Sequence, residues 1–341
     1  MKVGIDVSQA IYGTGVSDYV VNIVKHLPTQ DLVLWGGSLR RGSDIKALFP
    51  QALVSPLPPT AAHWLWNNLH LFDVQHLTGP VDVWHSSDWA QPPTRAKKVT
   101  TVHDLSPFLY PAELDPQIVA VQTARMKWVQ KECDQIICVS KNTADDLKRL
   151  FKVTDDRIKI IYEALPDRFL MKPQTTKQTN YIMTIGARQP RKNMQRLISA
   201  FQTYKDKLAL PPKLIIVGES AVTVSDPSIQ VTGYVSDQQL VDLLAGASVF
   251  VYPSLYEGFG LPVLGAFHFL VPVACADTSS LPEVAGDAAE YFDPLNEEQI
   301  AKAIAEAVAN KSKLVAAGKL QLGKFSWDKA AAETYAVYKQ L

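Results

Sequence analysis

Short apolar runs alternate with amphipathic runs along almost the whole chain, and the apolar runs end in polar or small residues. Such runs are typical of buried parallel strands, and the amphipathic segments between them are typical of covering helices. The pattern therefore predicts an α/β fold. In the first half, strands are expected at KVGIDV (2–7), DLVLWGG, VDVWHSS, KKVTTVHD and QIICVS, and helices at 17–27, 117–131 and 142–151.

The alternation lapses in EALPDRFLMKPQTTKQT (163–179), a polar segment with two prolines that is typical of a linker. The strand pattern restarts at Tyr181 with YIMTIGA and continues through KLIIVGES, SVFVYPS and PVACAD. We predict two doubly wound, Rossmann-like domains facing a cleft, residues 1–168 and 169–325, followed by a last segment, 326–341. In such sheets ligands bind at the carboxyl ends of the strands.

Composition and charge narrow the class of protein. Apolar residues make up 47% of the chain, too many for a disordered protein. Lys plus Arg and Asp plus Glu both total 34, so nucleic acid is not expected as a partner. The cysteines Cys133, Cys138 and Cys275 form no C-x-x-C pair and predict neither disulfides nor a zinc site. Without a signal-peptide pattern or a membrane-length apolar run, we expect a soluble, cytoplasmic protein, with the inner face of the membrane as an alternative location.

The loop Gly13-Thr14-Gly15 follows the first expected strand and precedes a helix. It resembles the start of G-x-G-x-x-G, but Asp18 stands at the third glycine position. Two interpretations stay open: a tight turn that needs glycine's freedom at positive φ, and a loop whose N–H groups approach a phosphate. This loop alone does not support an NAD-dependent oxidoreductase.

The segment IGARQPRKN places Arg188, Arg191 and Lys192 between a strand and a helix. Cations at a helix start oppose the helix dipole, which favours anions there. A bound diphosphate would resolve the conflict, and a solvated basic turn is the alternative.

His103 ends an expected strand, and His85 and Asp88 are similarly placed. A lone histidine is more often structural than catalytic, so these positions stay ambiguous on their own. The chain has no D-x-D metal clamp, no Walker loop and no G-x-S-x-G elbow. If a phosphate leaves here, cationic side chains and backbone amides must stabilise it without a protein-held metal.

The order of several motifs resembles a known family. The second half carries GARQPRKN, GYVSDQQL, GASVFVYPSLYEGFGLPVLGA and SSLPEVAGDAAEYFDP, and the first half carries GTGVSDY, DVWHSSDW and VTTVHDLSPFLYP. Together they cover nearly the whole chain and resemble the retaining, GT-B-fold glycosyltransferases of family 4 (glycosyl transferases group 1). The resemblance implies a hexosyltransferase of polysaccharide biosynthesis, with a nucleoside-diphosphate sugar as donor, no further cofactor, and a glycan, a lipid-linked compound or a small molecule as acceptor. It also implies that the helix Trp327–Leu341 returns to the first domain.

The resemblance assigns the donor diphosphate to two loops. Lys192 matches the lysine that binds the diphosphate, and Gly15 matches the loop glycine near it. The family often has an arginine where this chain has Ala187, and Arg188, the next residue, is the expected substitute.

The resemblance assigns the donor sugar and the base to other positions. Glu257 matches the first carboxylate of the E-x7-E motif, beside the sugar and the reacting centre, and His103 matches a histidine that touches the sugar. The remaining expected donor contacts are the backbone of Tyr234 and Val235 at the base and the turn Gly258, Phe259, Gly260 and Leu261 at a phosphate or sugar hydroxyl.

Gly265 is the departure, because most relatives have a second glutamate there that holds the ribose hydroxyls. A lost charge-assisted hydrogen bond costs roughly 1.5–3 kcal/mol, so we expect Gly265→Glu to tighten nucleoside-diphosphate binding about tenfold or more. The glycine either makes room for a bulky neighbour such as Phe267 or Phe269 or reflects a lost contact. The sequence favours an active enzyme, and the alternative is a catalytically impaired relative that serves as a binding or regulatory subunit.

The segment AAHWLWNNLHLF (61–72) is rich in aromatic residues. It is interpreted as a helix packed on the core, because no basic excess stands beside it in the sequence. A rim of an acceptor groove and a weak peripheral contact with a membrane are the alternatives.

Overall fold

The computed structural model describes residues 1–341 except 175–178, 187 and 220–223. The chain forms two units. Unit 1 comprises Met1–Glu163 and Ser326–Leu341, and unit 2 comprises Ala164–Phe325. The first division falls at the start of the predicted linker, a few residues before the predicted boundary after Arg168.

Unit 1, all of whose residues are described, contains a parallel seven-stranded sheet in the order β3-β2-β1-β4-β5-β6-β7. The central strand β1 pairs with both neighbours, so that Val3 lies opposite Leu32 and Val83. The strands are β1 (Val3–Asp6), β2 (Leu32–Gly37), β3 (Leu53–Ser55), β4 (Val83–Ser86), β5 (Lys97–Val102), β6 (Gln135–Cys138) and β7 (Ile158–Ile160).

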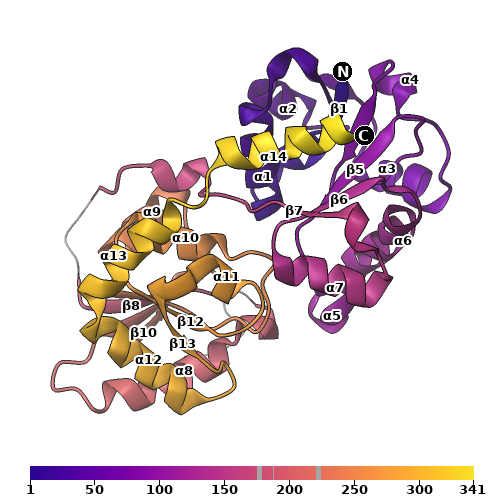
Figure 1. Cartoon of the computed structure of the whole chain (residues 1–341). Coiled ribbons are helices and arrows are strands. Elements are labelled where there is room, and N and C mark those ends of the chain that lie inside the picture. The colour runs from indigo at the N-terminus through magenta and orange to yellow at the C-terminus, as the bar shows by residue number, and fades with distance from the viewer. Residues whose placement is uncertain (175–178, 187, 220–223) are drawn as a thin grey trace. The chain divides into compact units, whose positions relative to one another are not determined.

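Helices pack on the sheet of unit 1, and the last helix, α14, lies beside α1 (Figure 1). The longer helices α1, α6, α7 and α14 each bury part of their residues; in α7, for example, Ser140 caps the first turn while Ala144 and Leu147 are buried. The helices are α1 (Gly15–His26), α2 (Gly42–Leu48), α3 (Pro59–Ala62), α4 (Gln75–Thr78), α5 (Ser106–Leu109), α6 (Pro116–Glu132), α7 (Lys141–Phe151) and α14 (Trp327–Gln340), with the π-helix η3 (His63–Asn68) and the 3-10 turns η1 (Ser8–Ile11), η2 (Thr29–Asp31), η4 (Pro111–Glu113) and η5 (Asp155–Arg157).

The described residues of unit 2 form a parallel six-stranded sheet in the order β10-β9-β8-β11-β12-β13. Its strands are β8 (Tyr181–Ile185), β9 (Lys213–Val217), β10 (Ile229–Val231), β11 (Val249–Tyr252), β12 (Val273–Ala276) and β13 (Ala289–Phe292). Its helices are α8 (Met194–Lys205), α9 (Asp237–Gly246), α10 (Leu261–His268), α11 (Leu281–Ala285), α12 (Glu297–Ala309) and α13 (Lys311–Leu322), with the 3-10 turns η6 (Asp167–Leu170), η7 (Pro190–Lys192) and η8 (Gly286–Ala288).

Both sheets reverse their winding direction once. In unit 1 the order reverses between β1 and β4, and in unit 2 it reverses between β8 and β11. The loops that follow these strands diverge and leave room for a ligand at the carboxyl edge of the sheet. The predicted fold class, two doubly wound α/β domains with parallel sheets, is confirmed.

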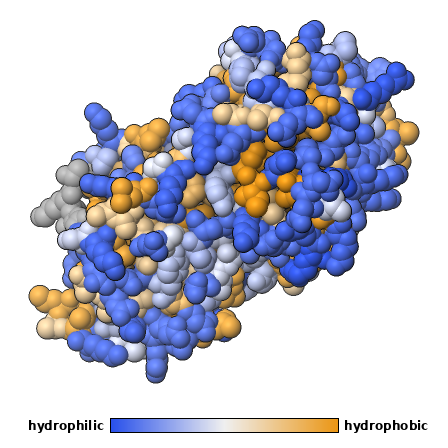
Figure 2. Space-filling model, viewed as in Figure 1, coloured by the Kyte–Doolittle hydropathy of each residue, from blue (hydrophilic) through white to orange (hydrophobic). Residues whose placement is uncertain are grey.

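The face of the molecule in Figure 2 is largely hydrophilic, with separate apolar areas. Within the described ranges, no helix combines the length and the apolar character that crossing a bilayer requires.

Candidate functional site

The candidate site in unit 2 lies at the reversal point of the sheet. Lys192 ends the 3-10 turn η7 after β8, and Glu257 stands in the loop between β11 and α10. Since β8 and β11 are hydrogen-bonded neighbours, the two loops begin side by side.

Lys192 and Glu257 form a largely buried ion pair. The Lys192 Nζ lies 2.6 Å from the Glu257 Oε1, and the two side chains are only 15% and 11% exposed. Lys192 also donates to the hydroxyl of Tyr252 at 3.2 Å, and its ammonium lies over the tyrosine ring, 5.4 Å from the centroid. The pair therefore places two opposite charges close together at the carboxyl ends of the central strands β8 and β11.

Mutual attraction fixes the charges of this pair. Burial is the largest single influence and lowers the pKa of Lys192, but the charge and hydrogen bond of Glu257 together with Tyr252 outweigh it and raise that pKa. Burial likewise favours neutral Glu257, and the charge and hydrogen bond of Lys192 outweigh it and lower the pKa of the carboxyl. Burial and the nearby Glu257 raise the pKa of Tyr252. At neutral pH the lysine is therefore cationic, the glutamate anionic and the tyrosine neutral.

Two serines hold the backbone of Glu257. The Glu257 N–H donates to the Ser279 Oγ at 3.0 Å, and that hydroxyl donates back to the Glu257 carbonyl at 2.7 Å. The Ser280 hydroxyl, which is buried, lies 3.0 Å from the same carbonyl and 2.7 Å from the carbonyl of Phe259. The carboxylate is thus presented from a loop whose position is fixed by the segment before α11.

The turn after Glu257 leads into α10. Gly260 caps the helix at a φ of 114°, a conformation that a non-glycine residue would adopt only with strain. Leu261 is the first helical residue, and Gly258 precedes the turn. The Phe259 ring is buried and meets the Phe325 ring edge-on, so its side chain belongs to the core.

Gly265 lies inside α10 and is tightly enclosed. A Cβ on this residue would lie 2.9 Å from the ring of Phe169 and 3.1 Å from the side chain of Leu244. Gly265 therefore makes room for a bulky neighbour, but that neighbour is Phe169 of η6 and not Phe267 or Phe269. Phe267 instead packs on Gly318, where a Cβ would meet its ring at 2.7 Å.

The other cations near η7 have partners of their own. Arg188 is exposed, and its Nε lies 2.9 Å from the Glu219 carboxylate. Arg191 donates to the carbonyl of Tyr256 at 3.3 Å and so ties η7 to the Glu257 loop. Within the basic cluster, Arg188 and Lys192 thus have carboxylate partners, and Arg191 donates to a neutral carbonyl. Ala187 lies outside the described residues.

The predicted base contacts lie in the loop before α9. Tyr234 is 92% exposed, and Val235 is half-buried. The loop is attached to the end of β9 by a bridge between Gly218 and Gly233. The structure therefore leaves the side chain of Tyr234 free of the core.

Unit 1 carries the two remaining predicted residues. Gly15 is the first residue of α1, which Thr14 caps together with Ser17, and Gly13 takes a φ of 68° in the turn. His103 lies after β5, and its Nδ1 lies 2.9 Å from the Glu163 carboxylate. Burial alone would lower the pKa of His103, but the hydrogen bond and charge of Glu163, with smaller contributions from nearby aspartates, raise it.

His85, by contrast, is enclosed within unit 1. Its two ring nitrogens are hydrogen-bonded to the hydroxyls of Tyr338, at 2.6 Å, and Thr101, at 3.0 Å. Burial lowers the pKa of His85 to about 3, so the ring is neutral. Asp88 has an ion-pair partner instead, since Arg125 lies 3.5 Å from its carboxylate.

The sequence did not point to several residues that shape these sites. Tyr252 ends a strand that was recognised, and Ser279 belongs to a recognised motif, but neither carried a signal of its own. Asn193 buries its amide between the carbonyls of Pro253 and Pro294, and Glu163 was assigned to a linker. Among the described residues, no group of three His, Cys, Asp or Glu side chains is placed to hold a metal ion.

Comparisons with known proteins identify the class. The model of the family "Glycosyl transferases group 1" matches residues 167–320, and that of "Glycosyltransferase Family 4" matches residues 13–167. The chain belongs to this family of GT-B-fold glycosyltransferases.

Individual relatives are mannosyltransferases of O-antigen chains. The chain is 32% identical to the O-antigen chain mannosyltransferase B of Escherichia coli over 293 residues, which cover 76% of this chain and 74% of the relative. It is 27% identical to the O-antigen chain mannosyltransferase RfbU of Salmonella typhimurium, with 62% and 61% covered.

Solved structures share the fold at low identity. The sucrose-phosphate synthase of Thermosynechococcus elongatus matches with a TM-score of 0.75 and 16% identity, covering 100% of this chain and 98% of that chain. Anabaena HepE in complex with UDP and glucose matches with a TM-score of 0.72 and 14% identity, covering both chains completely.

Proposed function

We propose that this chain is an active, retaining glycosyltransferase that moves a mannosyl residue from a nucleoside-diphosphate sugar to a glycan, lipid-linked or small-molecule acceptor without a protein-held metal. The observation that carries the proposal is the buried pair of Lys192 and Glu257 at the reversal point of unit 2. The choice of sugar is supported by the mannosyltransferases among the relatives.

The chemistry assigns different tasks to the two members of the pair. In the reaction, the bond between the anomeric carbon and the diphosphate breaks, a bond from an acceptor hydroxyl oxygen to the same face of that carbon forms, and the proton of that hydroxyl passes to the departing diphosphate. Negative charge grows on the diphosphate in the transition state, and a cation already fixed in place stabilises that charge without reorganisation. Lys192 is such a cation, with Arg188 and the Gly15 amide as further donors to the diphosphate.

Glu257 and His103 would orient the sugar. Glu257 carries its negative charge at neutral pH and is fixed through its backbone, so it can accept hydrogen bonds from sugar hydroxyls and shield a developing positive charge at the anomeric carbon. The Nδ1 of His103 is engaged by Glu163, which leaves the opposite ring nitrogen as the group for a sugar hydroxyl.

The test is a turnover assay on the purified chain with UDP- and GDP-linked mannose and glucose and a set of mannosyl acceptors. We expect release of nucleoside diphosphate that depends on the acceptor, persists in EDTA and gives a product with the anomeric configuration of the donor, as read by NMR. An inverted product, or loss of turnover in EDTA restored by a divalent metal, would contradict the mechanism. Binding of donor without turnover on any acceptor would favour the impaired-relative alternative.

A further inference from the structure

Unit 1 exposes a group of large apolar side chains around the π-helix η3. Trp64, Leu69, Leu71 and Phe72 are 64%, 57%, 59% and 45% exposed. These four residues are called the apolar patch below. Single exposed apolar residues are normal, but a group that includes two aromatic side chains calls for an explanation.

Hydrogen bonds hold the patch together. The N–H of Leu69 donates to the carbonyl of Trp64 at 3.0 Å, and the N–H of Leu71 donates to the carbonyl of Leu65 at 3.1 Å. The indole N–H of the buried Trp66 donates to the carbonyl of Phe72 at 3.1 Å. The loop is therefore folded back against η3, which brings the backbone of these four exposed residues into one small region of the fold.

The backbone is strained where it presents these side chains. His70 and Phe72 adopt positive φ values of 53° and 73°, which bulky residues rarely do. Such conformations persist only where the surrounding structure enforces them, and they cluster at functional sites, as π-helices often do. The side chains of Leu71 and Phe72 remain in solvent, so their own burial does not offset this strain.

Two lysines from a distant part of the chain flank the patch. Trp128 of α6 stacks on His70 with ring centroids 3.5 Å apart, and its indole N–H donates to the carbonyl of Asn67. The ammonium groups of Lys127 and Lys131 lie 5.3 and 5.0 Å from the Trp128 ring, and both residues are exposed. Segment 61–72 has no basic excess beside it in the sequence, but in the folded chain two lysines of α6 lie near it.

The acidic groups nearby do not cancel this charge. Glu132 is engaged by Lys98, at 2.9 Å, and by His70, at 3.0 Å.

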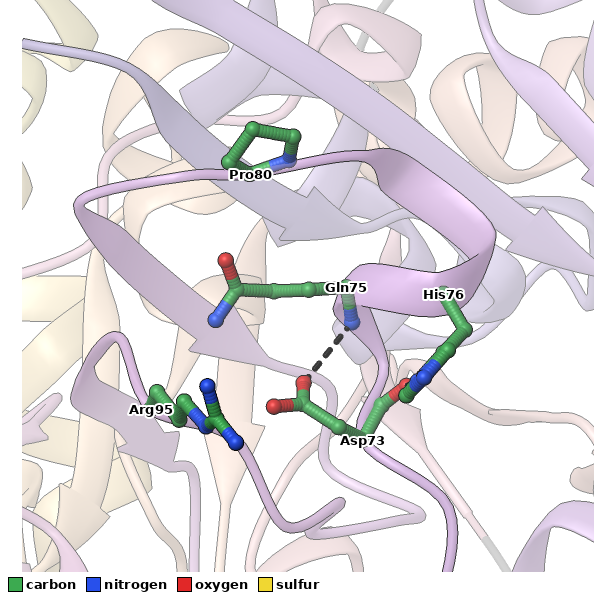
Figure 3. Close-up of a pocket in the computed structure, with 5 residues that line it drawn as sticks. All are labelled: Asp73, Gln75, His76, Pro80 and Arg95. Carbon is green, nitrogen blue, oxygen red and sulfur yellow. Dashed lines mark hydrogen bonds between the residues drawn. The ribbon is translucent and has the colours of Figure 1, made fainter.

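A surface cavity of about 380 Å³ adjoins the patch, because the ring of His76, which lines it, lies against Phe72. Figure 3 shows Asp73, Gln75 and Arg95 turned toward this space, with the Asp73 carboxylate accepting the Gln75 N–H. The cavity holds charges of both signs, so the cationic character belongs to α6.

We propose that the apolar patch docks on the surface of an anionic lipid bilayer, with its side chains entering the interface and with Lys127 and Lys131 facing the lipid phosphates. Tryptophan, leucine and phenylalanine beside lysine are the composition of an interfacial membrane contact. A protein interface is the less suitable alternative, because its buried core is depleted in lysine. A lysine at a bilayer can bury its stem while its ammonium stays among the headgroups.

The experiment is flotation of the purified full-length chain with vesicles of phosphatidylcholine alone or with about a third phosphatidylglycerol. It contains no nucleotide sugar, so its outcome is separate from that of the proposed function. We expect binding to the anionic vesicles that weakens with salt. Lys127→Gln/Lys131→Gln should lower the partition coefficient roughly tenfold or more, and Leu71→Ser/Phe72→Ser should lower it at least as much, roughly tenfold or more.

Matched controls come from unit 2. Leu210→Ser/Leu320→Ser removes two side chains that are 84% and 78% exposed, and Lys313→Gln/Lys319→Gln removes two exposed lysines. Both controls should bind like the wild type, and thermal melting should show that all variants are folded. The proposal is overturned if the wild type does not float with anionic vesicles or if the controls lose binding equally. It is also overturned if light scattering shows a dimer that Leu71→Ser/Phe72→Ser dissociates, because the patch would then bind a second copy.

Discussion

The ring of Phe169 occupies the space that a side chain on residue 265 would need. Phe169 is 1% exposed, and an added Cβ at Gly265 would lie 2.9 Å from its ring. A glutamate there would overpack this contact and bury a carboxylate among apolar groups. We now expect Gly265→Glu to lower the free energy of unfolding by roughly 2–4 kcal/mol and not to tighten nucleoside-diphosphate binding.

Denaturant unfolding and calorimetry with a nucleoside diphosphate measure both effects. Phe169→Ala/Gly265→Glu is the matched control, since the smaller side chain makes room, and it should be less stable than the wild type by less than the sum of the two single changes. A Gly265→Glu variant of wild-type stability that binds tenfold more tightly would restore the original expectation and refute this one.

Breaking the Lys192–Glu257 pair should be costly for stability. Lys192→Met leaves a carboxylate with its main partner gone in a largely buried place, and removal of one member of a buried pair costs about 3–5 kcal/mol. Lys192→Met/Glu257→Gln should be more stable than Lys192→Met, because neither charge remains. Lys302→Met is the control at an exposed pair, where the Nζ lies 3.5 Å from Glu306, and it should cost less than about 1 kcal/mol. Equal losses at the two sites, measured by urea unfolding, would contradict the buried character of the first.

Lys192→Met should also lower kcat as well as raise KM. The reason is that Lys192 would stabilise charge that grows on the diphosphate in the transition state, an effect typically worth about 10²–10³ in kcat. Steady-state kinetics with saturating acceptor measure it, and Lys302→Met serves again as the control. A rise in KM at constant kcat would show that the lysine binds donor and transition state equally well.

Stability should depend on pH through His103. The pKa of His103 is raised above its ordinary value of 6.5 by Glu163. A raised pKa in the folded state means that the pair contributes its full stability below about pH 6.5 and loses it as the pH rises through the folded-state pKa. The difference in unfolding free energy between wild type and Glu163→Gln should therefore shrink with rising pH. The exposed His76→Gln should not reproduce this trend, and a difference that grows with pH would contradict the assignment.

The strands that were recognised in the sequence and those that were missed differ in position. The central strands β1, β4, β5, β8 and β11 are buried on both faces and read as apolar runs. The strands that sequence reasoning missed are β3, β7, β10 and β13, the four at the sheet edges. Each of these strands is three or four residues long and has partly exposed positions. The reason is that an edge strand has a neighbouring strand on one side only, and its other side faces solvent. Such segments carry no apolar run to recognise.

The site divides in a similar way. The loops that carry Lys192 and Glu257 follow recognisable strands and carry recognisable motifs, so their positions could be predicted. The contact between Phe169 and Gly265 could not, because it depends on how a segment of the predicted linker packs on α10. The pairing of His103 with Glu163 joins residues 60 positions apart and has no local signature either.

The membership of α14 in unit 1 has a consequence for how the protein is made. Tyr338 supplies a hydrogen bond to the buried His85, and Trp327 meets the ring of Tyr19 edge-on, yet all of unit 2 is translated between these partners. As the nascent chain leaves the ribosome, unit 2 has its full sequence before unit 1 does. A premature stop codon near residue 326 would therefore spare unit 2 and leave unit 1 with an uncovered α1 and with His85 bonded to Thr101 alone. To express unit 1 by itself, residues 326–341 must be joined to residue 163 by a connector.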